Sequence, residues 1–124
     1  MNDVVHIVDD DRAVRESIAF LLQVEALNSR LYESAEAFLE NAGALENGCI
    51  ITDVRMPGLN GLELVERLNE LGVGMPIIML TGHADVALAV AAMKLGVADF
   101  LEKPFDDAAL LAAVRAALAH GDAA

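Results

Sequence analysis

Short apolar runs alternate with helix-like segments five times along the chain, and this alternation restricts the fold more than any other feature of the sequence. The runs are too short for helices and indicate buried strands, whereas the segments between them repeat apolar residues at helical spacing. The predicted strands are residues 4–8, 29–32, 49–52, 76–80 and 97–101. Strict β-α alternation predicts an α/β fold, doubly wound, with a mainly parallel sheet and helices on both faces.

Each predicted helix carries an apolar stripe that would face the sheet. The stripes are Val14, Ile18, Leu21 and Leu22; Phe38 and Leu39; Leu64, Val65, Leu68 and Leu71; Val86, Ala89, Val90 and Met93; and Leu111, Val114 and Leu118. Asp11, Ser34 and Asp85 stand where helix N-caps are expected. The last helix is predicted from about residue 107 to residue 119, with Gly121 past its end.

The polarity of the strands predicts their order in the sheet. The first, third and fourth strands are nearly all apolar, as strands covered on both faces should be. The second and fifth are more polar and belong at the edges. This pattern selects the order 2-1-3-4-5, which is the flavodoxin-like order. No linker, repeat or low-complexity segment interrupts the chain, so a single domain over residues 1–124 is expected.

The composition restricts the partners of the chain. Its formal net charge is −12, from 20 acidic and 8 basic side chains. This acid excess argues against direct binding to nucleic acid, which needs clustered Lys and Arg, and is compatible with a divalent cation. No apolar run approaches the ~20 residues of a membrane helix, and the N-terminus lacks a signal-peptide pattern. Cys49 lies alone in an apolar run, so a buried inert thiol and a reducing cytoplasm are expected.

Polar side chains follow four of the predicted strands: Asp9 and Asp10, then Asp53, Thr81 and Lys103. In the predicted fold these strand ends share one edge of the sheet. Crowded carboxylates repel unless a cation neutralises them, and oxygen ligands without a Cys/His cluster favour Mg²⁺ or Mn²⁺. Asp53 is the candidate nucleophile, because a carboxylate beside such an ion, with a hydroxyl and an ammonium nearby, suits phosphoryl transfer to aspartate.

Taken one at a time, these residues also have purely structural interpretations. Asp11 is expected to cap a helix rather than bind a metal, and a single Asp at a strand end usually forms a turn. His6 is expected to be structural, and His83 to be a loop residue near the site. The convergence of four strand ends favours the functional interpretation.

The motifs at these strand ends resemble the receiver domain of two-component response regulators over essentially the whole chain. The similarity is carried by VDDD at residues 8–11, TDVRMPGLNG at 52–61, LTGH at 80–83 and FLEKPF at 100–105. The longer stretches at residues 6–10, 34–39 and 91–94 most closely resemble the FixJ-like branch of the family.

The resemblance implies that Asp53 is the phosphoacceptor and that its phosphodonor is a sensor histidine kinase. It also implies a Mg²⁺ ion, for which Mn²⁺ or Ca²⁺ could substitute. The ion would be held by Asp10, Asp53 and the backbone carbonyl of Arg55, with Asp9 acting through water. The chain would then not be an enzyme, since autophosphorylation and slow self-dephosphorylation are its only expected reactions.

The same resemblance implies that Thr81 and Lys103 bind the phosphoryl oxygens. The Lys103–Pro104 bond would be cis, which aims the lysine inward; a cis bond is cheap only before proline. Phe100 would be the switch aromatic, which turns inward as Thr81 moves.

The predicted fourth and last helices are unusually apolar. Residues 86–93 include no polar side chain, and residues 108–119 include only Arg115. A helix that is apolar all round is normally covered on all sides, so these helices and the fifth strand are expected to form a homodimer surface after phosphorylation. The alternative is that alanine, which makes up most of these segments, favours helix and exposes little apolar area.

Three other functions compete with this interpretation. A haloacid-dehalogenase-like phosphatase would use the Asp-x-Asp of residues 9–11, with Asp9 as nucleophile. A pseudo-receiver would be an interaction module that never takes phosphate. A flavodoxin would need a Ser/Thr/Gly-rich loop after the first strand, which this chain lacks. Contact with DNA is expected only through a C-terminal helix-turn-helix domain, which is absent from this chain. The chain is expected to be either an excised or a stand-alone receiver.

Overall fold

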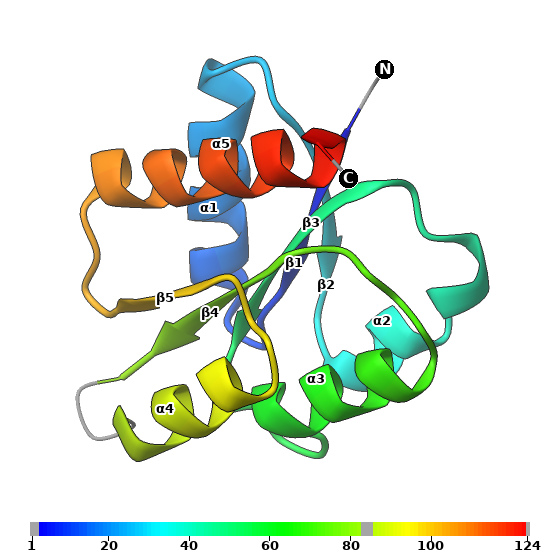
Figure 1. Ribbon diagram of the computed structural model, residues 1–124. Coiled ribbons are helices and arrows are strands. Elements are labelled where there is room, and N and C mark those ends of the chain that lie inside the picture. The colour runs from blue at the N-terminus through cyan, green and yellow to red at the C-terminus, as the bar shows by residue number, and fades with distance from the viewer. Residues whose placement is uncertain (1–2, 83–85, 124) are drawn as a thin grey trace.

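In the described chain, parallel strands form a five-stranded sheet that lies between two layers of helices (Figure 1). The computed structural model describes residues 3–82 and 86–123. In chain order the elements are β1 (Val4–Val8), α1 (Arg12–Val24), β2 (Asn28–Tyr32), α2 (Ala35–Leu39), the short 3-10 helix η1 (Ala42–Ala44), β3 (Gly48–Asp53), α3 (Gly61–Glu70), β4 (Ile77–Thr81), α4 (Val86–Lys94), β5 (Asp99–Glu102) and α5 (Asp107–Ala123). The sheet order is β2-β1-β3-β4-β5, which confirms the predicted α/β fold and strand order.

The burial of each strand explains its place in the sheet. Every residue of β1, β3 and β4 is buried, because helices cover both faces of the sheet there. β2 and β5 expose most of their side chains and lie at the two edges. The register pairs Val8 with Thr52, and Asp53 with Leu80. The central strands therefore end close together at one edge of the sheet.

Side chains alternate between two apolar cores, one on each face of the sheet. Helices α1 and α5 cover one face, and α2, α3 and α4 cover the other (Figure 1). Ile7 and Ile51 pack in the first core, whereas Ile50 packs with Phe38 in the second. This division follows from the two-residue period of a strand. Cys49 is buried in the first core, and burial raises the pKa of its thiol to about 12, in agreement with the predicted inert thiol.

Side-chain caps set the starts of three helices. Asp11 and Ser34 accept hydrogen bonds from main-chain N–H groups in the first turns of α1 and α2, as predicted. Asn60 and Glu63 form a reciprocal capping box at the start of α3, which was not predicted. Asp85, the predicted cap of α4, lies outside the described residues.

The two alanine-rich helices differ from their predicted form. α5 continues through Gly121 to Ala123, although a glycine inside a helix costs ~1 kcal/mol relative to alanine. Ala89 of α4 is buried as predicted, but Val90 and Met93 of the predicted stripe are exposed and Ala92 is buried. An all-apolar helix gives no periodic signal for its buried face.

The buried face of α5 and the bounds of β5 also differ from the sequence prediction. The buried face of α5 is Leu110, Ala113, Val114 and Ala117, whereas Leu111 and Leu118 pack only partly buried. β5 spans Asp99–Glu102 rather than residues 97–101. None of the described helices is long and apolar enough to cross a membrane.

Candidate functional site: an acidic cluster at the sheet edge

The carboxyl ends of β1, β3, β4 and β5 lie side by side, and each brings a polar side chain to the same edge of the sheet. These side chains are Asp9 and Asp10 after β1, Asp53 at the end of β3, Thr81 at the end of β4 and Lys103 after β5. In open α/β sheets this is the edge at which ligands bind. The fold thus brings together residues that are far apart in the sequence.

Three carboxylates form an acidic cluster, in which one oxygen each of Asp9, Asp10 and Asp53 lies within 4.8 Å of the other two. Asp9 is fully buried, Asp53 is 9 % exposed and Asp10 is exposed. Burial raises the pKa of Asp9, and the charges of Asp53 and Asp10 add to that effect. A hydrogen bond from the Asp11 N–H and the charge of Lys103 oppose it. Further positive charge would stabilise the ionised cluster.

Lys103 provides the ammonium group of this cluster. Its Nζ atom donates a hydrogen bond of 3.0 Å to Oδ2 of Asp53 and lies 3.5 Å from Oδ2 of Asp9. Burial disfavours the ammonium ion, but the hydrogen bond and charge of Asp53 and the charge of Asp9 outweigh burial and raise the pKa of Lys103. The backbone N–H of Lys103 donates to the carbonyl of Thr81 at 2.7 Å, and the Lys103–Pro104 bond is cis.

The two carboxylate oxygens of Asp9 have different surroundings. Oδ1 accepts a hydrogen bond of 2.9 Å from the N–H of Asp11. Oδ2 is buried and has no hydrogen-bond partner among the described residues, although Lys103 lies 3.5 Å away. A buried acceptor in this state is costly, and a hydrated divalent cation would satisfy it. The cluster offers oxygen donors only, which fits Mg²⁺ or Mn²⁺.

The loop that follows β3 is tied closely to the rest of the site. A Cβ atom at Gly61 would lie 2.3 Å from the carbonyl oxygen of Asp53, so only glycine fits there without movement of the main chain. Glu36 of α2 accepts a hydrogen bond of 3.2 Å from the N–H of Leu59. Arg55 lies in this loop, and its N–H lies 3.5 Å from Oδ1 of Asp53.

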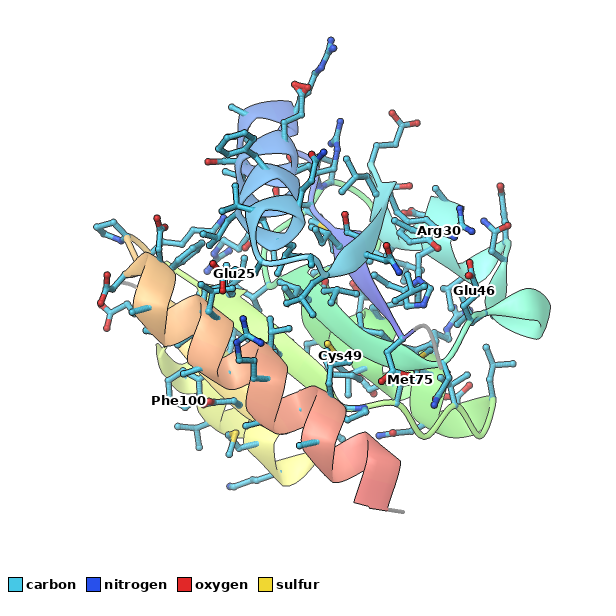
Figure 2. All side chains as sticks on the ribbon, turned by 90° about the horizontal axis from the view of Figure 1, so that it is seen from above. Glu25, Arg30, Glu46, Cys49, Met75 and Phe100 are labelled. Carbon is cyan, nitrogen blue, oxygen red and sulfur yellow. The ribbon has the colours of Figure 1, made fainter. Side chains whose placement is uncertain are left out.

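Thr81 and Phe100 lie on neighbouring strands in contrasting surroundings. Thr81 is buried, and its Oγ1 hydroxyl lies 3.5 Å from the carbonyl oxygen of Leu101. Phe100 directly precedes Leu101 on the edge strand β5 and is 37 % exposed. Figure 2 shows its ring at the β5 edge of the molecule. The Thr81 hydroxyl is therefore one hydrogen bond and one peptide unit away from the residue that carries an exposed aromatic ring.

His6 is buried on β1 and has a structural environment, as predicted. Its Nε2 atom lies 2.8 Å from the carbonyl oxygen of Glu46, and its Nδ1 atom lies 3.0 Å from the hydroxyl of Tyr32. Because a carbonyl only accepts, the neutral ring donates from Nε2 and accepts from Tyr32 at Nδ1. Burial lowers the pKa of His6. Arg30 and Glu46 form an ion pair beside it (Figure 2).

Two side-chain contacts near the cluster were not predicted from the sequence. The guanidinium of Arg15 donates a hydrogen bond of 2.7 Å to the carbonyl of Asp9, and Glu36 binds the loop after β3. Both bonds join a side chain to the main chain, and such a bond leaves no compositional signal in one sequence. His83, which was expected near the site, lies outside the described residues.

A family model described as the response regulator receiver domain matches residues 5–115. This chain belongs to that family. The receiver domain is 62 % identical over 114 residues to the transcriptional regulatory protein FixJ of Azorhizobium caulinodans, and the alignment covers 92 % of this chain and 54 % of FixJ. It is 46 % identical over 120 residues to FixJ of Bradyrhizobium diazoefficiens, covering 97 % and 58 % of the two chains.

Solved structures place the receiver domain in the same branch. Full-length FixJ from B. japonicum superposes with a TM-score of 0.93 at 45 % identity, covering 98 % of this chain and 60 % of that one. A structure named FixJ-N superposes with a TM-score of 0.92 at 45 % identity, covering 97 % and 96 %. The FixJ-like resemblance predicted from the motifs is confirmed. The chain spans little more than half the length of these curated relatives.

Proposed function

We propose that this receiver domain accepts a phosphoryl group on Asp53 from a sensor histidine kinase. The observation that carries the proposal is the position of Asp53 at the end of β3, in an acidic cluster, with Lys103 bonded to its Oδ2 atom at 3.0 Å. Asp9, which a haloacid-dehalogenase-like phosphatase would use, is fully buried and has Oδ1 bonded to the Asp11 N–H. Asp53 is therefore the better acceptor of the two.

The reaction is proposed to depend on Mg²⁺, with Mn²⁺ or Ca²⁺ able to substitute. The ligands would be Asp10, Asp53 and the backbone carbonyl of Arg55, with Asp9 acting through water. The buried Oδ2 atom of Asp9, which accepts no hydrogen bond among the described residues, and the all-oxygen donor set support this assignment. When bound, the cation neutralises the carboxylates and offsets charge on the phosphoryl oxygens.

The chain's own groups have distinct roles in the transfer. A carboxylate oxygen of Asp53 forms a bond to phosphorus while the phosphorus–nitrogen bond of the donor histidine breaks, and the electron pair leaves with the imidazole, which takes up a proton. Lys103 then pairs with the phosphoryl oxygens instead of the bare carboxylate, and the Thr81 hydroxyl donates to one of them. No further substrate turnover is proposed apart from slow self-dephosphorylation.

The signal is proposed to leave through the surface formed by α4, β5 and α5. Thr81 would release the Leu101 carbonyl to reach the phosphoryl group, and Phe100 would turn inward with it. Val90, Met93 and Phe100 are exposed apolar side chains on α4 and β5, which supports a homodimer contact there. A near-complete population swing needs only roughly 5.5 kcal/mol of differential stabilisation.

Membership of the receiver-domain family also suggests the phosphodonor and the output of this domain, and both belong to the proposal. FixJ of A. caulinodans is named a transcriptional regulatory protein, and we propose a similar output here. A cytoplasmic sensor kinase domain would supply phosphate, and DNA contact would belong to a C-terminal domain outside residues 1–124. The net charge of −12 supports separate DNA-binding machinery.

Incubation with acetyl phosphate and Mg²⁺, read by intact mass, tests the acceptor. Wild type is expected to gain one phosphoryl group, and Asp53→Asn none. A wild type that stays unmodified would overturn the proposal and favour a pseudo-receiver interaction module. Sedimentation with and without beryllofluoride, a phosphoryl mimic, tests the output. If the activated domain stays monomeric at high concentration, the dimer proposal fails.

A further inference from the structure

We propose that Arg15 is a positioning residue for the acidic cluster, and that it holds the turn which presents Asp9 and Asp10 to the metal. The inference rests on the proposed Mg²⁺ site. The guanidinium Nη1 atom of Arg15, on the fourth residue of α1, reaches back 2.7 Å to the carbonyl oxygen of Asp9. Its backbone N–H donates to the carbonyl of Asp11 at 3.0 Å. One residue thus binds both ends of the turn that contains Asp10.

The bonds of Asp9 show what this contact achieves. The N–H of Asp9 donates to the Tyr32 carbonyl at 3.2 Å, Oδ1 accepts from the Asp11 N–H, and the carbonyl accepts from Arg15. Every hydrogen-bonding group of Asp9 except Oδ2 is therefore engaged, and Oδ2 is the atom that lies toward the cluster and Lys103. Through this bond Arg15 fixes the orientation of the peptide group between Asp9 and Asp10.

Arg15 makes this contact within a surface cavity that carboxylates also line. Glu16, Glu33 and Glu40 line the same surface cavity as Arg15, but its guanidinium donates to a neutral main-chain oxygen. The neighbouring Arg12 behaves as an ordinary surface charge, because its side chain is 81 % exposed and pairs with Glu16 at 3.2 Å. Arg12 is therefore a charge-matched control on the same helix.

Whether replacing Arg15 weakens or tightens Mg²⁺ binding shows whether the side chain acts by positioning the ligands or through its charge. A cation near a metal site repels Mg²⁺, so loss of the Arg15 charge alone would tighten Mg²⁺ binding. Loss of a group that orients the ligands weakens it, typically by 10- to 100-fold. Arg15→Gln removes the charge and the bond, whereas Arg15→Lys keeps the charge but loses the planar fork.

The test is isothermal titration of Mg²⁺ into the full chain. Arg15→Gln is expected to bind Mg²⁺ about 10-fold more weakly than wild type, Arg15→Lys to lie between them, and Arg12→Gln to bind as tightly as wild type or tighter. If Arg15→Gln binds Mg²⁺ as tightly as wild type or tighter, the inference is overturned. If Arg15→Gln does not fold, Arg15→Lys is judged by the same criterion.

Hydrogen exchange of the Asp11 amide in metal-free protein supplies an independent readout. Because that amide is bonded to Oδ1 of Asp9, it is expected to exchange faster in Arg15→Gln than in wild type or Arg12→Gln. Unchanged exchange would contradict the positioning role. If wild type binds no Mg²⁺, the metal part of the proposed function fails, and this exchange measurement still decides whether Arg15 holds the turn.

Discussion

The ammonium of Lys103 lies between two carboxylates, 3.0 Å from Oδ2 of Asp53 and 3.5 Å from Oδ2 of Asp9. Without a bound metal, this ammonium offsets part of the repulsion within the acidic cluster. In the proposed reaction the same ammonium would turn from the Asp53 carboxylate to the phosphoryl oxygens. Lys103 therefore links the stability of the resting domain to its proposed chemistry.

Replacing Lys103 with Gln is expected to affect stability and metal binding in opposite directions. Loss of the charged hydrogen bond should lower the free energy of unfolding without Mg²⁺ by about 1–2 kcal/mol. Mg²⁺ should bind more tightly, because one competing cation is gone, while labelling by acetyl phosphate slows. Urea unfolding and Mg²⁺ titration measure both effects. Lys94→Gln removes the same charge at the end of α4, and equal Mg²⁺ affinities in the two variants would contradict this prediction.

Mg²⁺ is expected to stabilise the fold through the acidic cluster. At a concentration about 100 times its dissociation constant, a ligand specific for the native state adds about 2.7 kcal/mol. Asp10→Asn should lose most of this gain, and because Asp10 is exposed the variant should fold normally. Thermal unfolding followed by circular dichroism, with and without Mg²⁺, measures the gain. Glu70→Gln, an exposed change on α3, should keep it, and an equal gain in Asp10→Asn would exclude that ligand.

The buried His6 predicts a loss of stability on acidification. Burial lowers the pKa of His6 below its ordinary value of 6.5, so the unfolded chain binds the proton first as the pH falls. The contribution of neutral His6 to the free energy of unfolding is complete above pH 6.5. It is lost as the pH falls through the folded-state pKa, and the free energy of unfolding then decreases by at most ~1.4 kcal/mol per pH unit. His6→Gln should show a flatter pH profile in urea unfolding. Tyr32→Phe keeps the histidine and should keep the slope; identical slopes in wild type and His6→Gln would refute the prediction.

Gly61→Ala is expected to disturb the end of β3, which carries Asp53. The added Cβ would lie 2.3 Å from the carbonyl oxygen of Asp53 and 2.9 Å from Cα of Val54, and both are main-chain atoms that cannot rotate away. A loss of about 1–3 kcal/mol in the free energy of unfolding is expected, with weaker Mg²⁺ binding. Gly74→Ala is the matched control, since nothing lies within 4 Å of its added Cβ. Equal stability of the two variants would show that the chain adapts without cost.

The sequence predicted those parts of the site in which side-chain chemistry coincides with the end of a strand. Asp9, Asp53 and Lys103 each follow a strand whose position in the sheet was readable from its polarity, so their convergence was predictable. The interpretation of Asp11 as a cap was also confirmed, because capping uses a local pattern. These predictions depend on the spacing of apolar residues along the chain and on the local pattern of a helix cap, both of which a single sequence contains.

The features that were missed depend on information that a single sequence does not contain. Residues 86–93 of α4 are all apolar, so the spacing placed Val90 on the same face as the buried Ala89, although Val90 is exposed. Gly121 was predicted to lie past the end of the last helix, because glycine is common there, but α5 continues to Ala123. The bond from Arg15 to the Asp9 carbonyl joins a side chain to the main chain, and any residue at position 9 offers that carbonyl.

Tyr32 gives the molecule an optical property that follows from its contacts. It is the only tyrosine, and the chain has no tryptophan, so it dominates the near-ultraviolet fluorescence. Its main-chain carbonyl accepts a hydrogen bond from the N–H of Asp9, and the hydroxyl of its ring is bonded to the buried imidazole of His6. The domain thus contains one tyrosine whose residue is hydrogen-bonded to the turn of residues 9–11, and changes in that turn can be followed by intrinsic fluorescence without a label.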